Sequence, residues 1–593
     1  MTNFRLFRFL ALAGLALATS PFALAQSAPQ IDTAKVDAIF SAYDKPDSPG
    51  CALGVVRDGN FIYTRGYGLA NLEYSIPFSS KSVFDLGSTS KQFTAASILL
   101  LQQQGKLSLD DDIRKFVPEI PVYQKPVTIR HLLHHTSGLR DYLTLMSLAG
   151  VDFDGVTTDE DALAFIVRQN ALNFAPGDEY LYSNTGFFLL SVIVKRASGK
   201  SLREFAQENI FAPLEMKSTH FHNDHTMIVP NRASGYDRSE KAGFVIGMSG
   251  FEQTGDGSVY TTVEDLLKWD RNFYEPKVGG PSLIEQLQIT GVLNSGEKIT
   301  YARGLVVETY RGLKKVSHGG SWAGYRAQLL RFPEKKFSVI CLCNLGATNP
   351  SSLAQKVADV YLAADYAPEA AKAGVAPSAL SPAAAATAVT LSEDEIKHIG
   401  LYRNPVSGAY RRVVLQDNKL WIDSLLGPRR ELQPLASDRF RVLGAPANTE
   451  VTFIAPQGQF ALRLAREDSP AENFLAVEAA SPTAAQLAEF AGTFYSEELD
   501  TTYRFSVEEG KLTLRQKGRS PRAIIPTTRD TFFGPGSGTF EFQRSAPSPA
   551  NPSLPGASSN PGSSSSVGNP QGKVTGFLVQ AGRIRNVSFS RTP

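Results

Sequence analysis

An Ala/Pro-rich segment at residues 367–390, APEAAKAGVAPSALSPAAAATAVT, places the strongest constraint on how this chain can fold. It contains few large apolar side chains, so it cannot bury a core of its own, and its composition is typical of a linker. The chain has 593 residues in total, which is too many for a single hydrophobic core. We therefore expect separately folded regions before and after this segment.

The region before the linker, residues 26–366, contains both helix and strand signals. CALGVVRDGNFIYTRGYG predicts two strands that meet at Asp58-Gly59, and KQFTAASILLLQQQG predicts a buried helix that ends at Gly105. KVSHGGSWAGYRAQLLRFPEKKFSVICLCNL predicts two further strands joined at residues 333–336. Helices between hairpins, without a strand–helix–strand rhythm, indicate an α/β fold of the α+β type, with helices packed on an antiparallel sheet.

The region after the linker contains one pattern twice, at residues 391–480 and 481–593. A single shift aligns the two copies without a gap. The aligned pairs are Gly400 with Gly492, Tyr402 with Phe494, Leu420 with Leu512, Pro434 with Pro526, Asp438 with Asp530, and Phe440 with Phe532. Short strands separated by turns predict two small antiparallel β-barrels of a lipocalin-like kind, which would leave no open sheet edge.

Each copy has its own turn signal, Asp417-Asn418 in the first and Glu509-Gly510 in the second. The second copy also contains SAPSPANPSLPGASSNPGSSSSVGNPQG at residues 545–572. This segment has too few large apolar side chains to fold, so we expect a disordered insertion at the tip of a hairpin.

The N-terminus is typical of a secretory signal peptide, which we place at residues 1–25. Arg5 and Arg8 precede the apolar run FLALAGLALA, and the small residues ALA stand directly before Gln26. The sequence predicts an exported protein, periplasmic or secreted, and not an integral membrane protein, because no other run is long enough to span a bilayer. The 60 basic and 58 acidic residues nearly balance, which gives no electrostatic reason to expect a nucleic-acid partner.

The chain has only three cysteines, which makes a disulfide framework improbable even in an oxidising compartment. Cys341 and Cys343 stand two positions apart in the strand-like FSVICLCNL, so they share one face of it. We interpret the cysteines as buried free thiols and leave open whether Cys51 pairs with another.

A serine and a lysine three positions apart occur twice, as Ser88 and Lys91 in GSTSK and as Ser295 and Lys298 in NSGEK. NSGEK lies in a polar stretch that predicts a turn. Ser88 instead opens the predicted buried helix, where Lys91 lies on the same face and the helix N-terminus favours an alkoxide or an oxyanion. A buried lysine loses its proton more readily than a solvated one. The pair is a candidate nucleophile and base; the alternative is a helix cap beside a surface lysine.

Two further motifs contain candidate site residues. In APGDEYLYSNTGFFLL, Tyr182 and Asn184 point the same way from an extended segment; alternatively, Asn184 caps the next helix and Tyr182 packs on it. In SHGGSWAGYRAQLL, His318 precedes Gly319 and Gly320 inside a strand pattern, where glycine is costly unless another backbone approaches. The alternative there is a β-bulge beside a satisfied histidine.

Taken in order, STSK, YSN and HGG resemble the three motifs of the penicillin-recognising serine hydrolases, which include class C-type β-lactamases, DD-peptidases, D-aminopeptidases and related esterases. TIRHLLHHTSGL, FAPGDEYLYSNTGFFLLSVIVKRASGKS and GDGSVYTTVEDLLKW look like the same family, so that the resemblance spans residues 31–361. It implies that family's antiparallel sheet with a helical subdomain, and a site that needs no metal and no cofactor. The implied site residues are Ser88, Lys91, Tyr182 and His318 as catalytic groups, and Asn184, Gly319, Gly320 and Ser321 as substrate-binding groups.

The resemblance also implies roles. Ser88 would be the acylated nucleophile, Lys91 and Tyr182 would share the general-base and general-acid work, and Asn184 would hold the substrate amide. Tyr182 would serve as the base of the second step. The backbone N–H groups of Ser88 and Ser321 would form the oxyanion hole.

One departure bears on the substrate. His318 stands where many β-lactamases of this family have lysine, and a histidine anchors a carboxylate only in part near neutral pH. In this family the His-x-Gly form occurs among peptidases and D-aminopeptidases, and the two-barrel tail also resembles D-aminopeptidase architecture. The resemblance therefore implies a peptidase or esterase that acts on a small amide or ester, for example one with a D-amino acid. A class C-type β-lactamase and, in a different class, a non-catalytic cell-envelope binding protein are the alternatives.

Two histidine-rich stretches could suggest metal sites, but neither has the other groups that such a site needs. HFHNDH (His220, His222 and His225) has no matching cysteine or carboxylate pair at helical spacing beside it. HLLHH lacks the glutamate that zinc proteases use as a base. We therefore expect no metal site.

Overall fold

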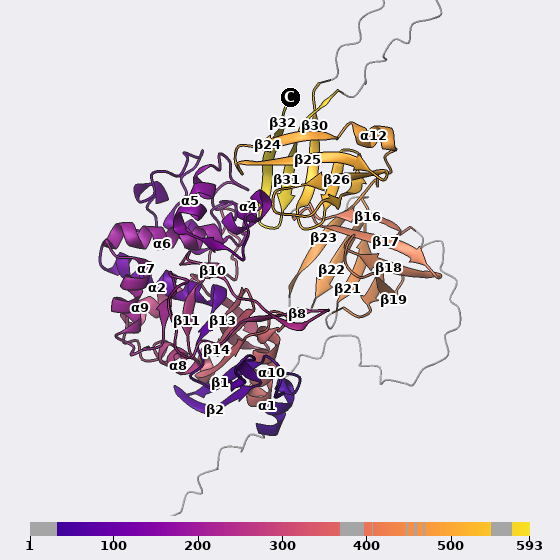
Figure 1. The fold of residues 1–593 in the computed structure, drawn as a ribbon. Helices are drawn as coiled ribbons and strands as arrows, with labels where there is room; N and C mark the ends of the chain where they lie inside the picture. Colours follow the sequence, from indigo (N-terminus) through magenta and orange to yellow (C-terminus); the bar gives the residue numbers. More distant parts are fainter. Residues whose placement is uncertain are drawn as a thin grey trace, which may run out of the picture.

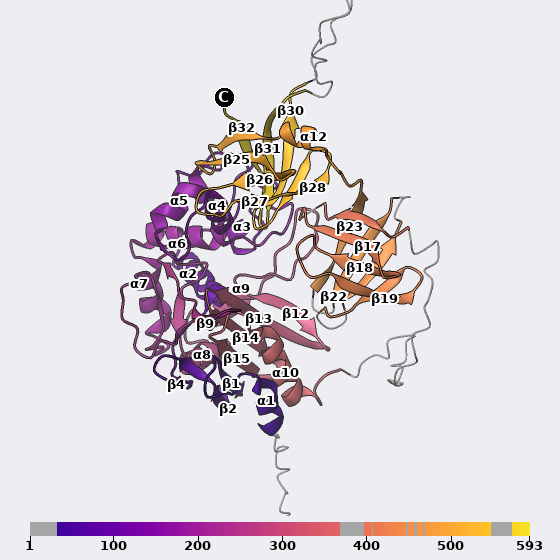
Figure 2. The same ribbon diagram turned by 45° about the vertical axis from the view of Figure 1, so that its right-hand side comes forward.

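The computed structural model describes residues 33–367, 397–405, 407–445, 449–455, 459–466, 469–546 and 572–593. The predicted signal peptide, all of the predicted linker except Ala367, and residues 547–571 of the predicted insertion lie outside the described residues. The described chain forms an N-terminal region, residues 33–367, and two C-terminal β units, which Figures 1 and 2 show one above the other to one side. Among the described helices, none has the length and apolar character required to cross a membrane.

An antiparallel sheet of six strands forms the centre of the N-terminal region, as the sequence predicts (Figure 1). The strands, in their order across the sheet, are β12 Val306–Tyr310, β13 Leu313–Trp322, β14 Tyr325–Phe332, β15 Phe337–Cys343, β1 Cys51–Arg57 and β2 Asn60–Tyr67. The segment expected to form two strands forms three. The chain reverses a second time at Ala323 and Gly324, between β13 and β14.

The helices of the N-terminal region lie on both faces of this sheet. They are α1 Thr33–Phe40, α2 Lys91–Gln103, α3 Ile129–Leu133, α4 Tyr142–Ala149, α5 Asp159–Val167, α6 Asn184–Ser198, α7 Leu202–Ala206, α8 Val263–Arg271, α9 Gly280–Leu287 and α10 Pro350–Leu362, with the short turns η1 Gly87–Ser90, η2 Ile113–Lys115, η3 Gln207–Phe211 and η4 Pro333–Lys335. Four small sheets accompany them: β3 Leu69–Asn71 with β4 Ile76–Pro77; β5 Phe84–Asp85, β11 Val259–Thr261 and β7 His220–Phe221; β6 Val156–Thr157 with β10 Gly250–Phe251; and β8 Tyr236–Ser239 with β9 Gly243–Ile246.

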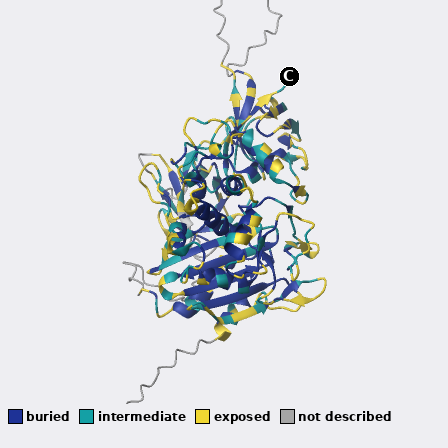
Figure 3. Cartoon of the chain, turned by 90° about the vertical axis from the view of Figure 1, so that its left-hand side faces the viewer, coloured by how far each residue is buried: buried dark blue, intermediate teal, exposed yellow. Residues whose placement is uncertain are grey.

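Both faces of the central sheet are apolar because alternate residues of a strand point to opposite faces. In β1, Leu53 and Val55 belong to the core shared with α1 and α10, whereas Ala52 and Val56 belong to the larger core that contains α2, α6 and α8. Figure 3 shows buried residues concentrated in these strands and in the helices packed on them. The buried helix predicted to end at Gly105 is α2, which ends at Gln103.

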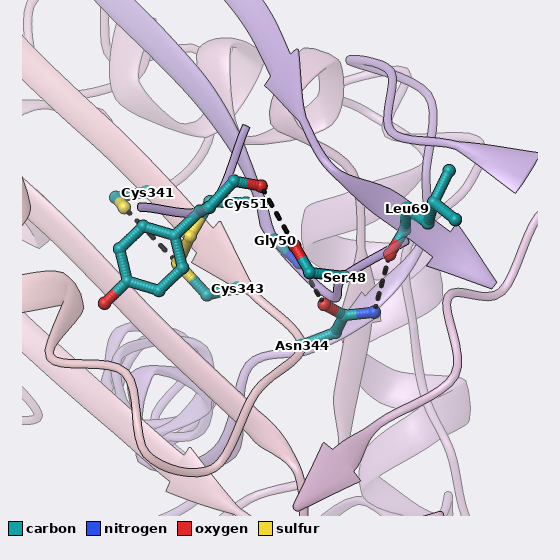
Figure 4. Close-up of a disulfide and its surroundings, with 8 residues drawn as sticks. Ser48, Gly50, Cys51, Leu69, Cys341, Cys343 and Asn344 are labelled. Carbon is teal, nitrogen blue, oxygen red and sulfur yellow. Dashed lines mark hydrogen bonds between the residues drawn. A yellow bond between two sulfur atoms is a disulfide. The ribbon is translucent and has the colours of Figure 1, made fainter. Parts of the chain in front are cut away.

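Cys51 and Cys343 form a disulfide (Figure 4). They stand opposite each other in the register of β1 and β15. Cys341 is free and buried, and its Sγ lies 3.7 Å from that of Cys343. The interpretation of all three as free thiols is therefore wrong for two of them. The sequence could not show this pairing because only the sheet register brings these two distant residues together.

The first C-terminal unit is a closed antiparallel barrel of eight strands. Its strands are β16 Gly400–Arg403, β17 Tyr410–Gln416, β18 Lys419–Asp423, β19 Arg430–Ala436, β20 Arg439–Val442, β21 Glu450–Ile454, β22 Ala461–Arg466 and β23 Ser469–Val477. The second unit begins with α12 Ala484–Ala488 and has nine strands, in the order β27-β26-β25-β24-β32-β31-β30-β29-β28. These strands are β24 Gly492–Ser496, β25 Thr501–Glu508, β26 Lys511–Arg515, β27 Arg522–Ala523, β28 Ile525–Thr528, β29 Thr531–Gly534, β30 Gly538–Arg544, β31 Val574–Ala581 and β32 Ile584–Arg591.

The predicted repeat corresponds to strand positions in both units. Gly400 and Gly492 begin β16 and β24, and the two turn signals form hairpin turns in which all four residues have positive φ. The ninth strand arises because the counterpart of β19 is divided into β27 and β28, which only Ile524 separates. The two barrels predicted from the sequence are therefore present, the first closed and the second nearly so.

Candidate active site

Ser88 and Lys91 lie where a short 3-10 turn leads into the buried helix α2. Ser88 belongs to η1 and Lys91 is the first residue of α2, so the serine precedes the α-helix that it was expected to open. Residues i and i+3 eclipse each other in a 3-10 turn, and the Nζ atom of Lys91 lies 3.1 Å from the Oγ atom of Ser88. The predicted contact is therefore made by a tighter turn than expected.

Glycines let η1 pack directly on β13. A Cβ atom on Gly87, whose φ is +49°, would lie 2.8 Å from the backbone nitrogen of Ser321, and one on Gly320 would lie 1.8 Å from the carbonyl oxygen of Leu86. The glycines of HGG therefore do permit a close backbone approach, here by the chain itself, and the regular β13–β14 register excludes the alternative of a bulge. The packing brings the backbones around Ser88 and Ser321 together.

Lys91 is fully buried and lies among three oxygen atoms. Besides Ser88, its Nζ atom lies 3.0 Å from Oδ1 of Asn184 and 2.5 Å from the carbonyl oxygen of Asp256. A neutral amine has two N–H donors for these two carbonyl-type acceptors and one lone pair for the Ser88 hydroxyl. Burial lowers the pKa of Lys91 well below its usual value, while the Asp256 carboxyl acts in the opposite direction and Arg583 adds to the lowering. The surroundings favour the form of lysine that acts as a base.

Asn184 is the first residue of α6, and its side chain points to Lys91 rather than capping the helix. Its backbone N–H donates to Oδ2 of Asp141 at 2.7 Å. Asp141, which is 1% exposed, also accepts from the backbone N–H of Thr144 at the start of α4. The alternative that Asn184 merely caps the helix is thus wrong. The Asp141 carboxylate accepts from the N–H group at the start of α6, and the Asn184 carboxamide faces Lys91 instead.

Tyr182 has a buried hydroxyl that makes no hydrogen bond to a described residue. Burial raises the pKa of this phenol, and the nearby Ser88 hydroxyl lowers it by a smaller amount. The Nζ atom of Lys91 lies 5.0 Å from the centroid of the Tyr182 ring. The site thus combines a lysine that readily loses its proton with a tyrosine that keeps its own.

His318 is buried, and both of its ring nitrogens have partners. Its Nδ1 lies 2.6 Å from the carbonyl oxygen of Gly319 and its Nε2 lies 3.0 Å from the hydroxyl of Tyr301. Since a carbonyl can only accept, Nδ1 donates and Nε2 accepts from the phenol. Burial lowers the pKa of His318 to about 4, and the charge of Lys91 acts in the same direction. This histidine is therefore a neutral group near pH 7.

Two buried residues that sequence reasoning did not single out support these groups. His135 accepts from the backbone N–H of Ser183 through Nδ1, at 3.2 Å, and its ring centroid lies 4.1 Å from that of Tyr182 and 4.4 Å from that of Tyr301. His135 belongs to HLLHH, which was weighed only as a metal motif. Nothing in the sequence around Tyr301 indicated its contact with His318.

One cavity of about 690 Å³ brings the predicted groups together. It is lined, among others, by Ser88, Tyr182, Asn184, His318, Gly319, Gly320 and Ser321, with Lys91 buried directly behind Ser88. Arg583, from the second C-terminal unit, also lines it, and no sequence signal pointed to this residue. Ser295 and Lys298, by contrast, lie exposed in a surface turn. Of the two Ser-x-x-Lys pairs, the one at Ser88 therefore lies at the cavity and the one at Ser295 does not.

The histidines of HFHNDH do not meet at one point. Nε2 of His220 lies 3.3 Å from Nδ1 of His222. His225 instead groups with Asp224 and Glu252 at the surface, with 2.6 Å between its Nδ1 and Oε1 of Glu252. The three-histidine metal site that was weighed from the sequence does not form.

A family model described as Beta-lactamase matches residues 36–364. Penicillin-binding protein 4* of Bacillus subtilis (strain 168) is 33% identical over 304 residues, which is 48% of this chain and 66% of that protein. A D-aminopeptidase of Gluconobacter oxydans (strain 621H) is 31% identical over 340 residues, 57% of this chain and 63% of that protein. The matches thus span just under two thirds of each relative's length.

A solved structure supports the fold. The octameric penicillin-binding protein homologue from Pyrococcus abyssi superposes with a TM-score of 0.53 and 24% sequence identity, over 75% of this chain and 100% of that one. At this identity the likeness concerns the fold alone.

Proposed function

Because the chain belongs to the Beta-lactamase family, we propose that it is a serine hydrolase that cleaves a small amide or ester through an acyl-enzyme. The observation that carries this proposal is the 3.1 Å contact between Oγ of Ser88 and a fully buried amine, Lys91. A serine hydroxyl is a weak nucleophile unless a base takes its proton. Lys91 is such a base once burial has removed its charge.

In the first half-reaction, Oγ of Ser88 attacks the substrate carbonyl carbon while its proton passes to Nζ of Lys91. The carbonyl oxygen becomes an oxyanion, which the backbone N–H groups of Ser88 and Ser321 stabilise. The bond to the leaving nitrogen or oxygen then breaks as Tyr182 donates its phenolic proton to that atom, and the proton on Lys91 restores the phenol. The products are the Ser88 ester and a neutral amine or alcohol.

In the second half-reaction, water attacks the ester carbonyl and its proton passes to Lys91. The bond to Oγ of Ser88 then breaks, and that oxygen takes the proton back, which releases the acid and restores every protein group. Since burial keeps the Tyr182 phenol protonated, we assign the base role to Lys91 in both steps and proton relay to Tyr182. Ping-pong kinetics follow from this scheme.

The substrate class rests on the relatives and on His318. One relative is named D-aminopeptidase, which favours an amide substrate that contains a D-amino acid. The neutral His318 cannot itself anchor a carboxylate as a lysine at that position does, so the third motif gives no support to the alternative of a class C-type β-lactamase. A panel of D-aminoacyl anilides, D-Ala-D-Ala peptides, short p-nitrophenyl esters and nitrocefin distinguishes these possibilities.

The test is covalent labelling with a neutral fluorophosphonate, read by mass spectrometry of the intact protein and of its peptides. We expect one adduct, on Ser88, and none in Ser88→Ala. Ser295→Ala is the matched control, because Ser295 has the same spacing to a lysine but lies in a surface turn, and it should label like the wild type. An unlabelled wild type that cleaves nothing in the panel would support the alternative of a non-catalytic cell-envelope binder.

We also propose that the protein is exported, to the periplasm or beyond. The signal-peptide pattern at residues 1–25 supports this. The Cys51–Cys343 disulfide suits an oxidising compartment. Fractionation followed by N-terminal sequencing should recover a mature chain that begins at Gln26, and an intact N-terminus in the cytoplasm would refute the proposal.

A further inference from the structure

The hairpin that joins β31 to β32 brings a cation from the second C-terminal unit to the cavity beside Ser88. Arg583 stands in this turn and lines the main cavity. It also lines a groove of about 480 Å³ between α4 and the second unit, which shares Leu143 and Asn184 with the main cavity. Figure 1 shows β31 running toward α4. Arg583 therefore lies at the junction of two spaces that a substrate can occupy.

Hydrogen bonds at Arg583 and Arg585 fix this turn on the N-terminal region. The side chain of Asn173 donates to the carbonyl of Arg583 at 3.0 Å and accepts from the backbone N–H of Arg585 at 2.7 Å. The Arg585 guanidinium pairs with Glu179 at 2.9 Å, and Arg140 donates to the carbonyl of Arg585 at 3.0 Å. Because the backbone of Arg583 is held in place before any ligand arrives, little further ordering is needed for it to bind one.

The Arg583 guanidinium forms an ion pair with the buried Asp141 but keeps N–H groups that can bind a ligand. It lies 4.6 Å from the centroid of the Tyr182 ring and 3.7 Å from Oδ2 of Asp141. It makes no hydrogen bond to another described residue, and its side chain is 42% exposed. Its planar fork of N–H donors matches the two oxygens of a carboxylate.

Arg326 and His318, the other basic side chains that line the cavity, have hydrogen-bond partners within the protein. Nη1 of Arg326 donates to the carbonyls of Ala323 and Tyr325 at 2.8 and 2.7 Å. His318 accepts from Tyr301 and donates to its own neighbour, so it carries no charge to offer. A carboxylate beside the Arg583 guanidinium is therefore attracted by it and an ammonium group is repelled. The carboxylates of Asp141, 3.7 Å from that guanidinium, and of Asp256, which also lines the cavity, act in the opposite direction.

We propose that Arg583 determines specificity by binding a carboxylate of the substrate close to the bond that Ser88 attacks. This inference rests on the proposed function and names its substrate class: an anionic amide or ester, in preference to a compound with a free ammonium group at that position. The cation that the third motif lacks in this chain is supplied instead by the second C-terminal unit.

The test compares substrates that differ only in charge. One series is D-alanine p-nitroanilide bearing an N-succinyl group, its neutral succinamoyl counterpart, or a free ammonium. A second series is N-acetyl-D-alanyl-D-alanine and its C-terminal amide, which moves the carboxylate to the leaving group. In at least one series we expect kcat/KM to be about 10- to 100-fold higher for the carboxylate than for its neutral counterpart, as a charge-assisted hydrogen-bonded pair allows.

Variants of Arg583 then assign the preference to this residue. The ratio of the two kcat/KM values should fall toward one in Arg583→Gln, remain in part in Arg583→Lys, and move in favour of the ammonium substrate in Arg583→Glu. Arg529→Gln is the matched control, because Arg529 is an exposed arginine of the same unit in the turn between β28 and β29, and it should keep the wild-type ratio.

Two results would overturn the inference: no charge preference in the wild type in either series, or an equal loss for charged and neutral substrates in Arg583→Gln, which indicates that Arg583 only positions Tyr182. Fluorophosphonate labelling of wild-type Ser88 separates this failure from a failure of the proposed function. A labelled protein without charge preference refutes only the role of Arg583, whereas an unlabelled protein that cleaves nothing in the panel refutes the proposed function itself.

Discussion

The two C-terminal units repeat one strand pattern but lie differently with respect to the cavity. The first closes into an eight-stranded barrel and hydrogen-bonds to the second, as between Arg403 and Gln580 at 3.1 Å and between Thr527 and Tyr410 at 3.2 Å. The second also contacts the N-terminal region, where the buried Arg140 pairs with Glu498. Among the described residues of the two units, only Arg583, in the second, lines the cavity.

This difference shows that the repeated sequence pattern specifies the fold of each unit but not the role of that unit in the protein. Pattern and turn residues specify a barrel in both copies, because strand alternation and turns with positive φ act locally. The role of each barrel depends on the surface against which it packs. Among substitutions that test this difference, the largest effects should therefore occur at the interface between the second unit and the N-terminal region.

Removing the buried arginine of that interface should have the largest effect. In Arg140→Ala, Glu498 loses its cation while only 9% of its side chain is exposed. Leaving one member of a buried ion pair without its partner typically lowers the free energy of unfolding by about 3–5 kcal/mol. We expect a lower unfolding midpoint in calorimetry and a lower kcat/KM, because the turn that carries Arg583 also loses its bonds to Arg140.

The matched control for Arg140→Ala lies in the first unit. Arg439 pairs with Glu450 at the surface, where 49% and 25% of the two side chains are exposed. Surface pairs of this kind contribute about 0–1 kcal/mol to the free energy of unfolding. Arg439→Ala should leave both the unfolding midpoint and kcat/KM close to the wild type. Equal effects of the two substitutions would contradict the distinction between the two units.

A smaller effect is expected from Asn173→Ala, which removes the two hydrogen bonds to the carbonyl of Arg583 and the backbone N–H of Arg585. Each such bond contributes about 0.5–1.5 kcal/mol, so kcat/KM for the carboxylate substrate should fall by about 5- to 150-fold while the fold persists. Circular dichroism checks the fold. Asn170→Ala, at an exposed position three residues earlier, is the control, and a loss of the same size there would rule out a specific role for Asn173.

The smallest predicted effect is a shift of the pH profile. Burial lowers the pKa of Lys91, and the charge of Arg583 lowers it further. As the base form is the neutral amine, kcat/KM should fall as the pH falls through the pKa of Lys91. In Arg583→Gln that pKa rises, so the acid limb should move to higher pH, by less than about one unit at this degree of exposure. Arg439→Ala should not move it, and a shift to lower pH in Arg583→Gln would contradict the assignment of Lys91 as the base.

Much of the site followed from spacing. Ser88 and Lys91 were predicted together because a three-residue separation places two side chains on one side of any helical turn. Tyr182 and Asn184 followed from alternation in an extended segment. Tyr301 and His135 did not follow, because their contacts with His318 and Tyr182 join segments that no local rule connects.

The sequence by itself determined the local geometry of this protein: the Ser88–Lys91 pair, the glycine turns and the repeated barrel pattern, since each depends on residues a few positions apart. Only the tertiary structure decided that Cys51 pairs with Cys343 and that Arg583 stands over Tyr182. Both depend on strand register or on the docking of separately folded units. Those arrangements are set by the sum of many weak contacts across surfaces, and no short stretch of sequence records that sum.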